Sequence, residues 1–158
     1  MLGGFRYSNT TPATMRAGAE LLETGVEPNI ISEALERKPY ESVKSLADAM
    51  QHIEMFHDGR AVGVFLDFAT IEKLESTEGL IDMIRVIDGA EIAVVLKEKE
   101  KDTCRVSMRS KGLDVTTIAT KFGGGGHVRA AGCAIKKPFA EAKAELLAAI
   151  HDALEQHS

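Results

Sequence analysis

The chain of 158 residues contains no tryptophan, and aromatic residues make up only 5% of it. The chain therefore has few aromatic side chains on which several bases of a nucleic acid could stack. Two cysteines, Cys104 and Cys133, are too few and too isolated for a disulfide framework or a zinc site, and we expect both to be buried thiols. No apolar run is long enough to span a bilayer, and residues 1–9 lack the pattern of a signal peptide. We therefore expect a cytoplasmic protein with no membrane partner.

The sequence is also poor in catalytic machinery. No carboxylate pair or histidine cluster has the spacing of metal ligands in a convincing context. We therefore assign no catalytic residue and no metal ligand, and a binding module describes the chain better than a complete enzyme. The net charge of −5 argues against a broad surface that coats nucleic acid, but it permits a local basic pocket for a small phosphorylated ligand.

Three helical patterns open the chain and then give way to strand-like patterns. Prolines mark the starts of the helices, which we expect over residues 12–24, 28–38 and 40–51. Strands are expected over residues 53–57, 60–68, 91–97, 103–109 and 130–136, and a closing helix over residues 138–154. This order predicts an α/β fold with a mixed sheet of five strands, or slightly more, and flanking helices. We place the boundary where the pattern changes, between a helical connector (residues 1–51) and an α/β domain (residues 52–158).

Two local patterns complete the expected fold. The mixed charges of residues 97–102 are typical of a solvated hairpin tip between two strands. Asp114 is expected to cap a helix over residues 115–122. This helix leads directly into the stretch of the sequence that says most about function.

Four consecutive glycines, Gly123, Gly124, Gly125 and Gly126, follow that helix. Such a run is costly inside a helix or a strand, and it predicts a tight loop between two ordered elements. A loop of this kind exposes several backbone N–H groups together, which makes a concave site for an anion. We interpret it as a phosphate-binding loop with His127 and Arg129 as donors at its rim. The alternative is a sharp turn with a structural histidine, because glycine motifs are weak evidence without context.

A second feature, residues 107–112, stands at the end of an expected strand, one short helix before the glycines. That spacing would bring both segments to one edge of the sheet. Arg109 could then clamp a phosphate with two parallel charge-assisted hydrogen bonds, with Ser110 beside it and Lys111 adding a point charge. Taken alone, the arginine is better explained as a surface residue with hydroxyl neighbours, but its pairing with the glycine loop favours the phosphate clamp.

These residues resemble a known family. The segments Arg105-Val-Ser-Met-Arg-Ser-Lys111 and Ile118-Ala-Thr-Lys-Phe-Gly-Gly-Gly-Gly-His-Val-Arg-Ala-Ala-Gly132 closely resemble the C-terminal DHH-associated domain of DHH-superfamily phosphoesterases. Residues 5–11 resemble the segment after the last metal-binding motif of that superfamily's N-terminal domain. Together they are most similar to the branch of bifunctional oligoribonucleases and pAp phosphatases, over nearly the whole chain.

The resemblance implies that two domains of one enzyme have different roles. The family's N-terminal domain holds two manganese ions through aspartates and histidines, including an Asp-His-His motif that this chain lacks. Met1 and Leu2 stand where the family has Asp-Thr before its glycine. The resemblance therefore implies that the chain binds no cofactor itself, that Mn²⁺ belongs to a missing N-terminal domain, and that the isolated chain is catalytically incomplete.

The resemblance also implies a substrate site and partners. Gly123 to Gly126, His127 and Arg109, with Ser110 and the more variable Arg129, would bind the phosphates of a short oligonucleotide or a pAp-like nucleotide. The N-terminal metal domain of the same enzyme would be the protein partner, and a homodimer stays open. Alternatives are an exopolyphosphatase-like or cyclic-dinucleotide phosphodiesterase fragment, or a non-catalytic module whose glycine loop docks on a partner.

Overall fold

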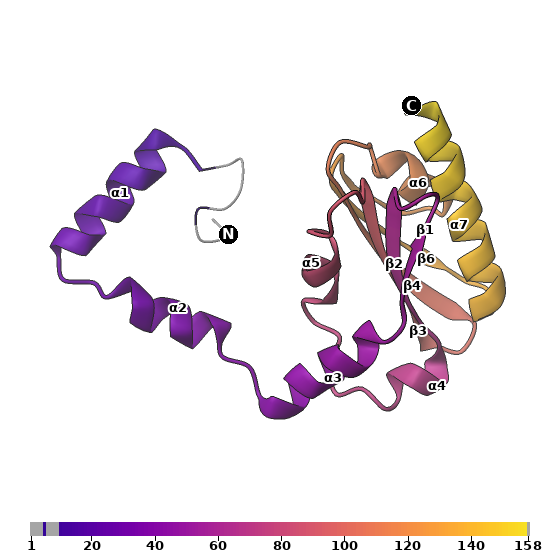
Figure 1. Ribbon diagram of the computed structural model, residues 1–158, viewed down its shortest axis with the longest axis horizontal. Coiled ribbons are helices and arrows are strands. Elements are labelled where there is room, and N and C mark those ends of the chain that lie inside the picture. The colour runs from indigo at the N-terminus through magenta and orange to yellow at the C-terminus, as the bar shows by residue number, and fades with distance from the viewer. Residues whose placement is uncertain (1–4, 6–9, 158) are drawn as a thin grey trace. The chain divides into compact units, whose positions relative to one another are not determined.

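The computed structural model describes residue 5 and residues 10–157, and these divide into two units that meet at Lys38 and Pro39 (Figure 1). Within the described ranges, no helix has the length and apolar character needed to cross a membrane. Most of the motif at residues 5–11, and the positions of Met1 and Leu2, lie outside the described residues. The predicted division at residue 52 stays a prediction.

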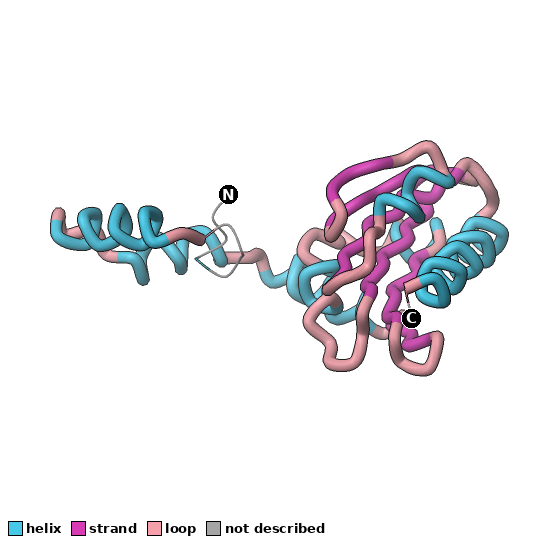
Figure 2. Tube along the Cα trace, turned by 90° about the horizontal axis from the view of Figure 1, so that it is seen from above, coloured by secondary structure: helices cyan, strands magenta, loops and turns pink. Residues whose placement is uncertain are grey.

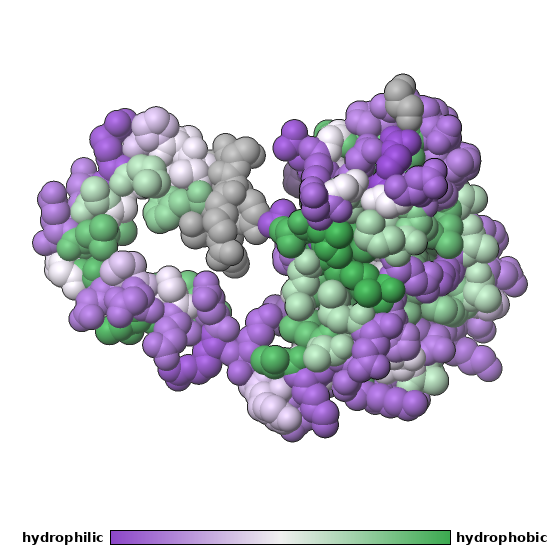
Figure 3. Space-filling model, in the orientation of Figure 1, coloured by the Kyte–Doolittle hydropathy of each residue, from purple (hydrophilic) through white to green (hydrophobic). Residues whose placement is uncertain are grey.

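The first unit contains two helices, α1 (Pro12–Glu23) and α2 (Pro28–Glu36). Each begins with its proline at the first helical position, and the Thr11 hydroxyl caps α1 by accepting a hydrogen bond from the Thr14 N–H at 3.2 Å. Neither helix buries a residue. Green apolar side chains gather on both helices in Figure 3, and the large ones are Met15, Leu21, Leu22, Ile30, Ile31 and Leu35. The two helices therefore have no core of their own.

The second unit is built around one six-stranded sheet with strand order β1-β2-β3-β4-β6-β5. Its strands are β1 (Ile53–Phe56), β2 (Ala61–Leu66), β3 (Ile92–Glu100), β4 (Thr103–Ser110), β5 (Gly125–His127) and β6 (Ala130–Ile135). The pair β2–β3 is parallel and every other pair is antiparallel. The predicted mixed α/β sheet is confirmed, and the sixth strand is β5, formed by part of the glycine run.

Five helices cover the sheet. They are α3 (Tyr40–Met50), α4 (Phe68–Ile71), α5 (Leu80–Ile84), α6 (Thr116–Lys121) and α7 (Phe139–Gln156). Helices α6 and α7 pack on one face, where the larger core takes residues from β2, β3, β4 and β6. Helices α3 and α5 pack on the other face in a smaller core, with α4 at its margin through Ile71. In Figure 2 the long helix that leads to the C-terminus lies alongside the magenta strands.

The two faces are covered unequally, and this asymmetry creates the site. The smaller core takes sheet residues only from β2 and β3, so among the described residues nothing from β4 or β6 is buried on that side. On the face of the smaller core, the residues of β4, β6 and β5 are partly or fully exposed. We call this surface the open face, and it consists of Arg105, Ser107, Arg109, Gly125, His127, Ala130, Gly132 and Ala134.

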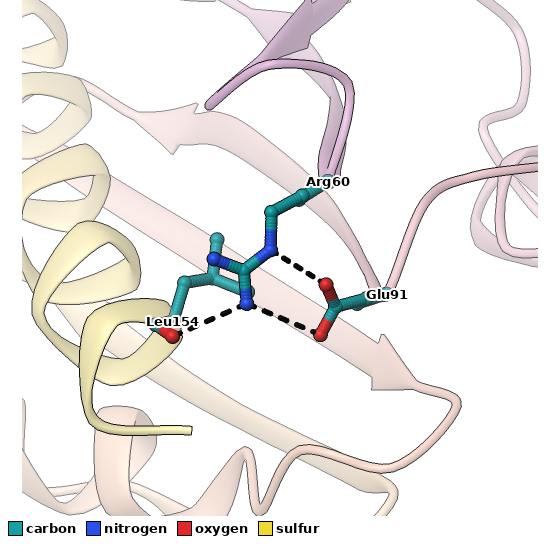
Figure 4. A network of polar contacts seen from close by, with 3 residues as sticks. All are labelled: Arg60, Glu91 and Leu154. Carbon is teal, nitrogen blue, oxygen red and sulfur yellow. Dashed lines mark hydrogen bonds and ion pairs between the residues drawn. The ribbon is translucent and has the colours of Figure 1, made fainter. Parts of the chain in front are cut away.

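A polar cluster connects the starts of β2 and β3 to the end of α7 (Figure 4). The Arg60 side chain donates from Nε to Glu91 Oε1 at 2.6 Å, and its Nη2 donates to the Leu154 carbonyl at 3.2 Å. The hydrogen bond between them lowers the pKa of the Glu91 carboxyl and raises that of the Arg60 guanidinium. A cation at the carboxyl end of a helix also interacts favourably with the helix dipole. Neither Arg60 nor Glu91 stood out in the sequence.

The charged run at residues 97–102 is only partly a solvated tip. Strand β3 continues to Glu100, and the turn itself is Lys101-Asp102, with Asp102 at a φ of 58°. Glu98 is 8% exposed, and its carboxylate accepts hydrogen bonds from the backbone N–H groups of Phe68 and Asp102. The prediction that residues 97–102 form a solvated tip is therefore wrong for Glu98, because the strand alternation turns this side chain inward.

Candidate anion-binding site

The first half of the glycine run ends helix α6. Gly123 has a φ of 68°, and its N–H donates to the Thr120 carbonyl at 3.0 Å. The Gly124 N–H donates to the Ala119 carbonyl at 2.9 Å. These two hydrogen bonds, with a left-handed glycine between them, make a Schellman cap. The amides of Gly123 and Gly124 therefore serve the end of the helix and are not among the several N–H groups that we expected the run to offer to an anion.

Two positions of the run, Gly124 and Gly126, need glycine because they pack against β6. A Cβ on Gly124 would lie 2.2 Å from the Gly132 carbonyl oxygen, and one on Gly126 would lie 2.5 Å from the Ala130 oxygen. By contrast, a Cβ on Gly125 would meet nothing within 4 Å, and its backbone needs no positive φ. Tight strand pairing explains Gly124 and Gly126, whereas the absence of a side chain at Gly125 leaves free space on the open face.

The hairpin that follows is tied to the end of β4. Its two-residue turn is Val128-Arg129, between the paired residues His127 and Ala130. The Val128 carbonyl accepts from the Val115 N–H at 2.9 Å, and the Arg129 carbonyl accepts from the Ser110 N–H at 3.2 Å. The two segments that looked separate in the sequence therefore meet at one edge of the sheet, as predicted.

Strand register places Arg109 and His127 on the same face. Arg109 of β4 lies opposite Ala130 of β6, and Ala130 in turn lies opposite His127 of β5. Residues directly opposite one another point to the same side of a sheet. With strands about 4.8 Å apart, the two Cα atoms are about 10 Å from each other, so both side chains can reach one group seated above Ala130.

The floor between these two side chains is made of small residues. Gly125 pairs with Gly132, next to the pair of His127 with Ala130, so a ligand can approach the backbone there. The guanidinium of Arg109 is steadied by a hydrogen bond from Nη1 to the Met108 carbonyl at 2.9 Å. This hydrogen bond uses one of the five N–H donors of the guanidinium and leaves others for a ligand.

Three other candidates from the sequence lie differently. The Ser110 hydroxyl donates to the Leu113 carbonyl, and the residue alternates with Arg109 to the opposite side of β4. The Lys111 Nζ donates to the Ile87 carbonyl at 2.7 Å, so it holds the loop after α5. Arg129 is exposed in the hairpin turn. Their assignment to the substrate stays a prediction, and among the described residues only the Arg129 side chain of the three forms no hydrogen bond or ion pair with the protein.

The structure adds residues that the sequence reasoning did not select. Arg105 and Ser107 precede Arg109 at every second position of β4, which strand alternation could have revealed. Lys97 of β3 lies opposite Arg105, a pairing that no local pattern shows. Within the described part of the chain, no carboxylate forms an ion pair with Lys97, Arg105 or Arg109. The open face and the neighbouring Lys97 therefore carry positive charges that no described carboxylate pairs with directly.

The described residues supply no metal centre and no reactive thiol. No group of three or more His, Cys, Asp or Glu residues among them could hold a metal ion. Cys104 and Cys133 are buried free thiols, as predicted. Burial raises the pKa of each to about 11, so both stay protonated at neutral pH.

Comparisons with known proteins match this architecture. Residues 63–156 match the family model described as the DHHA1 domain. The bifunctional oligoribonuclease and PAP phosphatase NrnA of Thermus thermophilus is 34% identical over 136 residues, which cover 85% of this chain and 41% of that protein. The protein of the same name from Bacillus subtilis is 31% identical over 137 residues, covering 84% and 43% of the two chains. The chain thus spans less than half the length of these relatives.

A solved structure shows the same fold. An exopolyphosphatase-related protein from Bacteroides fragilis superimposes with a TM-score of 0.83 and 20% identity, over 99% of this chain and 46% of that one. The family match itself runs from within β2 to the end of α7, which is more than half of the sequence and includes every residue of the open face. On this evidence the chain belongs to the DHHA1 domain family.

Proposed function

We propose that this chain is the substrate-binding part of a phosphoesterase that acts on short oligonucleotides or pAp-like nucleotides. The observation that carries the proposal is the convergence of Arg109 and His127 on one uncovered, cationic face above small residues. The substrate class comes from the relatives, two of which are named as oligoribonucleases and PAP phosphatases. A phosphate is the group common to these substrates, and it is the group that this face fits best.

In the proposed complex, a phosphate lies above Ala130. Arg109 donates two parallel charge-assisted hydrogen bonds to its oxygens, and His127 donates from the other side. The missing side chain at Gly125 lets the ligand contact the edge of the sheet. Holding a substrate in one orientation can lower a reaction barrier by roughly several kcal/mol. This effect needs no catalytic group on this chain.

The reactive centre is proposed to lie on another domain. The metal ions, expected to be manganese, would generate the attacking hydroxide and neutralise the leaving oxygen. The described residues do not fit a metal centre, so we assign them no step in the chemistry. We therefore expect the isolated chain to bind pAp without hydrolysing it, and an N-terminal metal domain to be its partner.

The test is a titration of the full chain with pAp by calorimetry and amide-resolved NMR. We expect Arg109→Gln to weaken binding about tenfold or more, because a hydrogen bond to a charged group contributes about 1.5–3 kcal/mol. Gly125→Ala should fold normally and also weaken binding, because its methyl group would occupy the ligand's space. Lys44→Gln, on the exposed side of α3, is the charge-matched control and should bind like the unmodified chain.

Two results would contradict the proposal. The first is pAp binding that is indifferent to Arg109→Gln and Gly125→Ala. The second is manganese-dependent hydrolysis by the isolated chain, which would show that the chain contains its own reactive centre. A competition between pAp and inorganic polyphosphate in the same assay separates the nucleotide assignment from an exopolyphosphatase-like one.

A further inference from the structure

Positive charge continues along the open face beyond Arg109. Arg105 lies four residues earlier on β4 and on the same face, which places its Cα about 13 Å from that of Arg109. Lys97 lies directly opposite Arg105 on β3, and the half-buried Ser107 stands between the two arginines. A line of donors therefore leads from Arg109 toward the opposite end of the strand.

The far end of this line is hollowed. A depression of about 350 Å³ is lined by Lys97, Lys99, Glu100, Thr103, Arg105 and Ser107. Pockets that hold small ligands begin at about 300 Å³, so the depression has room for a nucleotide-sized group. Ser107 belongs to its wall and is two residues from Arg109 on the same face of β4, so the depression adjoins the site described above.

Among the described residues, no carboxylate is within ion-pair distance of the cations of this depression. Glu100 belongs to the lining, and Glu75 and Glu78 line the adjoining hollow, but none of them forms an ion pair with Lys97, Lys99 or Arg105. The Lys97 Nζ is held by a hydrogen bond to the Thr77 hydroxyl at 3.0 Å. Burial, and then the charge of Lys99, lower the pKa of Lys97. An anion bound between the two amines would relieve this repulsion.

We propose that this distal cluster, Lys97, Lys99 and Arg105, binds a second phosphate of a phosphate chain whose first phosphate occupies Arg109 and His127. The inference rests on the proposed function and extends it. Neighbouring phosphates of one strand are further apart than the ~3.4 Å axial rise of a stacked step, so a separation of about 13 Å corresponds to about two to four nucleotide steps. The site would therefore favour an oligonucleotide of three to five residues, roughly, over a single nucleotide.

The experiment compares ligands of increasing length on the full chain. The probes are pAp, a 5′-phosphorylated adenosine dinucleotide and a 5′-phosphorylated adenosine pentanucleotide, with inorganic polyphosphate of five units as a parallel arm. We expect the pentanucleotide to bind tenfold or more tightly than pAp. Lys99→Gln combined with Arg105→Gln should remove most of that gain, and both side chains are exposed, so the fold should tolerate the change. Lys44→Gln is again the control.

Salt dependence gives a second readout that a general loss of structure would not mimic. Each phosphate contact to a single strand contributes about 0.7 to the slope of log K against log salt. Because the distal cluster is proposed to hold one phosphate, the double variant should therefore flatten the slope for the pentanucleotide by about 0.7 and leave the slope for pAp as it was. In NMR titrations, the pentanucleotide should raise the pKa of Lys97 and pAp should not.

The outcomes separate this inference from the function on which it rests. If pAp binds at Arg109 but the pentanucleotide binds no more tightly, the distal subsite is refuted and the proposed function stands. The same holds if the double variant weakens both ligands equally. If no phosphorylated ligand responds to Arg109→Gln, both proposals fail. If polyphosphate equals the pentanucleotide and shows the same variant effects, the subsite stands as one for a phosphate chain of either source.

Discussion

The glycine run allows the structure to be tested one position at a time. In Gly124→Ala, the new Cβ would lie 2.2 Å from the Gly132 oxygen and 2.5 Å from the Cys133 Cβ, whereas ordinary contact begins at 3.4 Å. Backbone lies on both sides of this contact, so β5 and β6 would have to separate by about 1 Å. Overpacking of a rigid site costs about 1–3 kcal/mol, and we expect the upper part of that range.

The neighbouring positions serve as matched controls. Gly125→Ala meets no atom within 4 Å, so its effect on the free energy of unfolding should stay within about 0.5 kcal/mol. Gly123→Ala also has free space, but its φ of 68° requires the left-handed region, at a cost of about 1–2 kcal/mol. The expected order of stability is therefore Gly125→Ala, then Gly123→Ala, then Gly124→Ala.

Thermal and urea unfolding followed by far-UV circular dichroism measure this order. For a unit of this size, 1 kcal/mol shifts the midpoint temperature by about 4 °C, so Gly124→Ala should melt roughly 10 °C lower than the parent chain. Gly125→Ala should melt at the parent temperature even though we expect it to weaken pAp binding. Equal destabilisation by Gly124→Ala and Gly125→Ala would refute the β5–β6 packing described here. So would a Gly124→Ala chain with an unchanged midpoint.

Three further predictions concern ionisable groups. Cys104 and Cys133, with pKa values of about 11, should react with a thiol reagent at neutral pH only after unfolding, and rapid labelling of the native chain would contradict their burial. Lys99→Gln should raise the lowered pKa of Lys97, measured by NMR of the lysine side chain; an unchanged value would mean that burial alone sets it. Because the pKa of Glu91 is lowered in the folded state, its contribution to stability is present above its ordinary value of 4.5 and is lost as pH falls through the lower folded value. Glu91→Gln should therefore reduce the pH dependence of the unfolding free energy below pH 5, roughly, and an identical pH profile would contradict the prediction.

Much of the fold follows from local patterns. The proline starts of α1 and α2, the Thr11 cap and the alternating strands all depend on residues close together in the sequence. The glycine run could be selected because four consecutive glycines follow a helical pattern. Arg109 could be selected because it stands at the end of an expected strand, one short helix before that run. What these residues do with their hydrogen bonds was less predictable, since the Gly123 and Gly124 amides could serve an anion or a helix end equally well.

The sequence by itself therefore determined the class of the fold, the family and the two segments that meet at the site. Only the tertiary structure decided which residues share a face, because strand order and register come from pairing between distant segments. That pairing sets Arg109 beside His127, turns Ser110 away, and aligns Lys97 with Arg105. It also leaves the residues of β4 and β6 on that side at least partly exposed, because the smaller core buries strand residues only of β2 and β3.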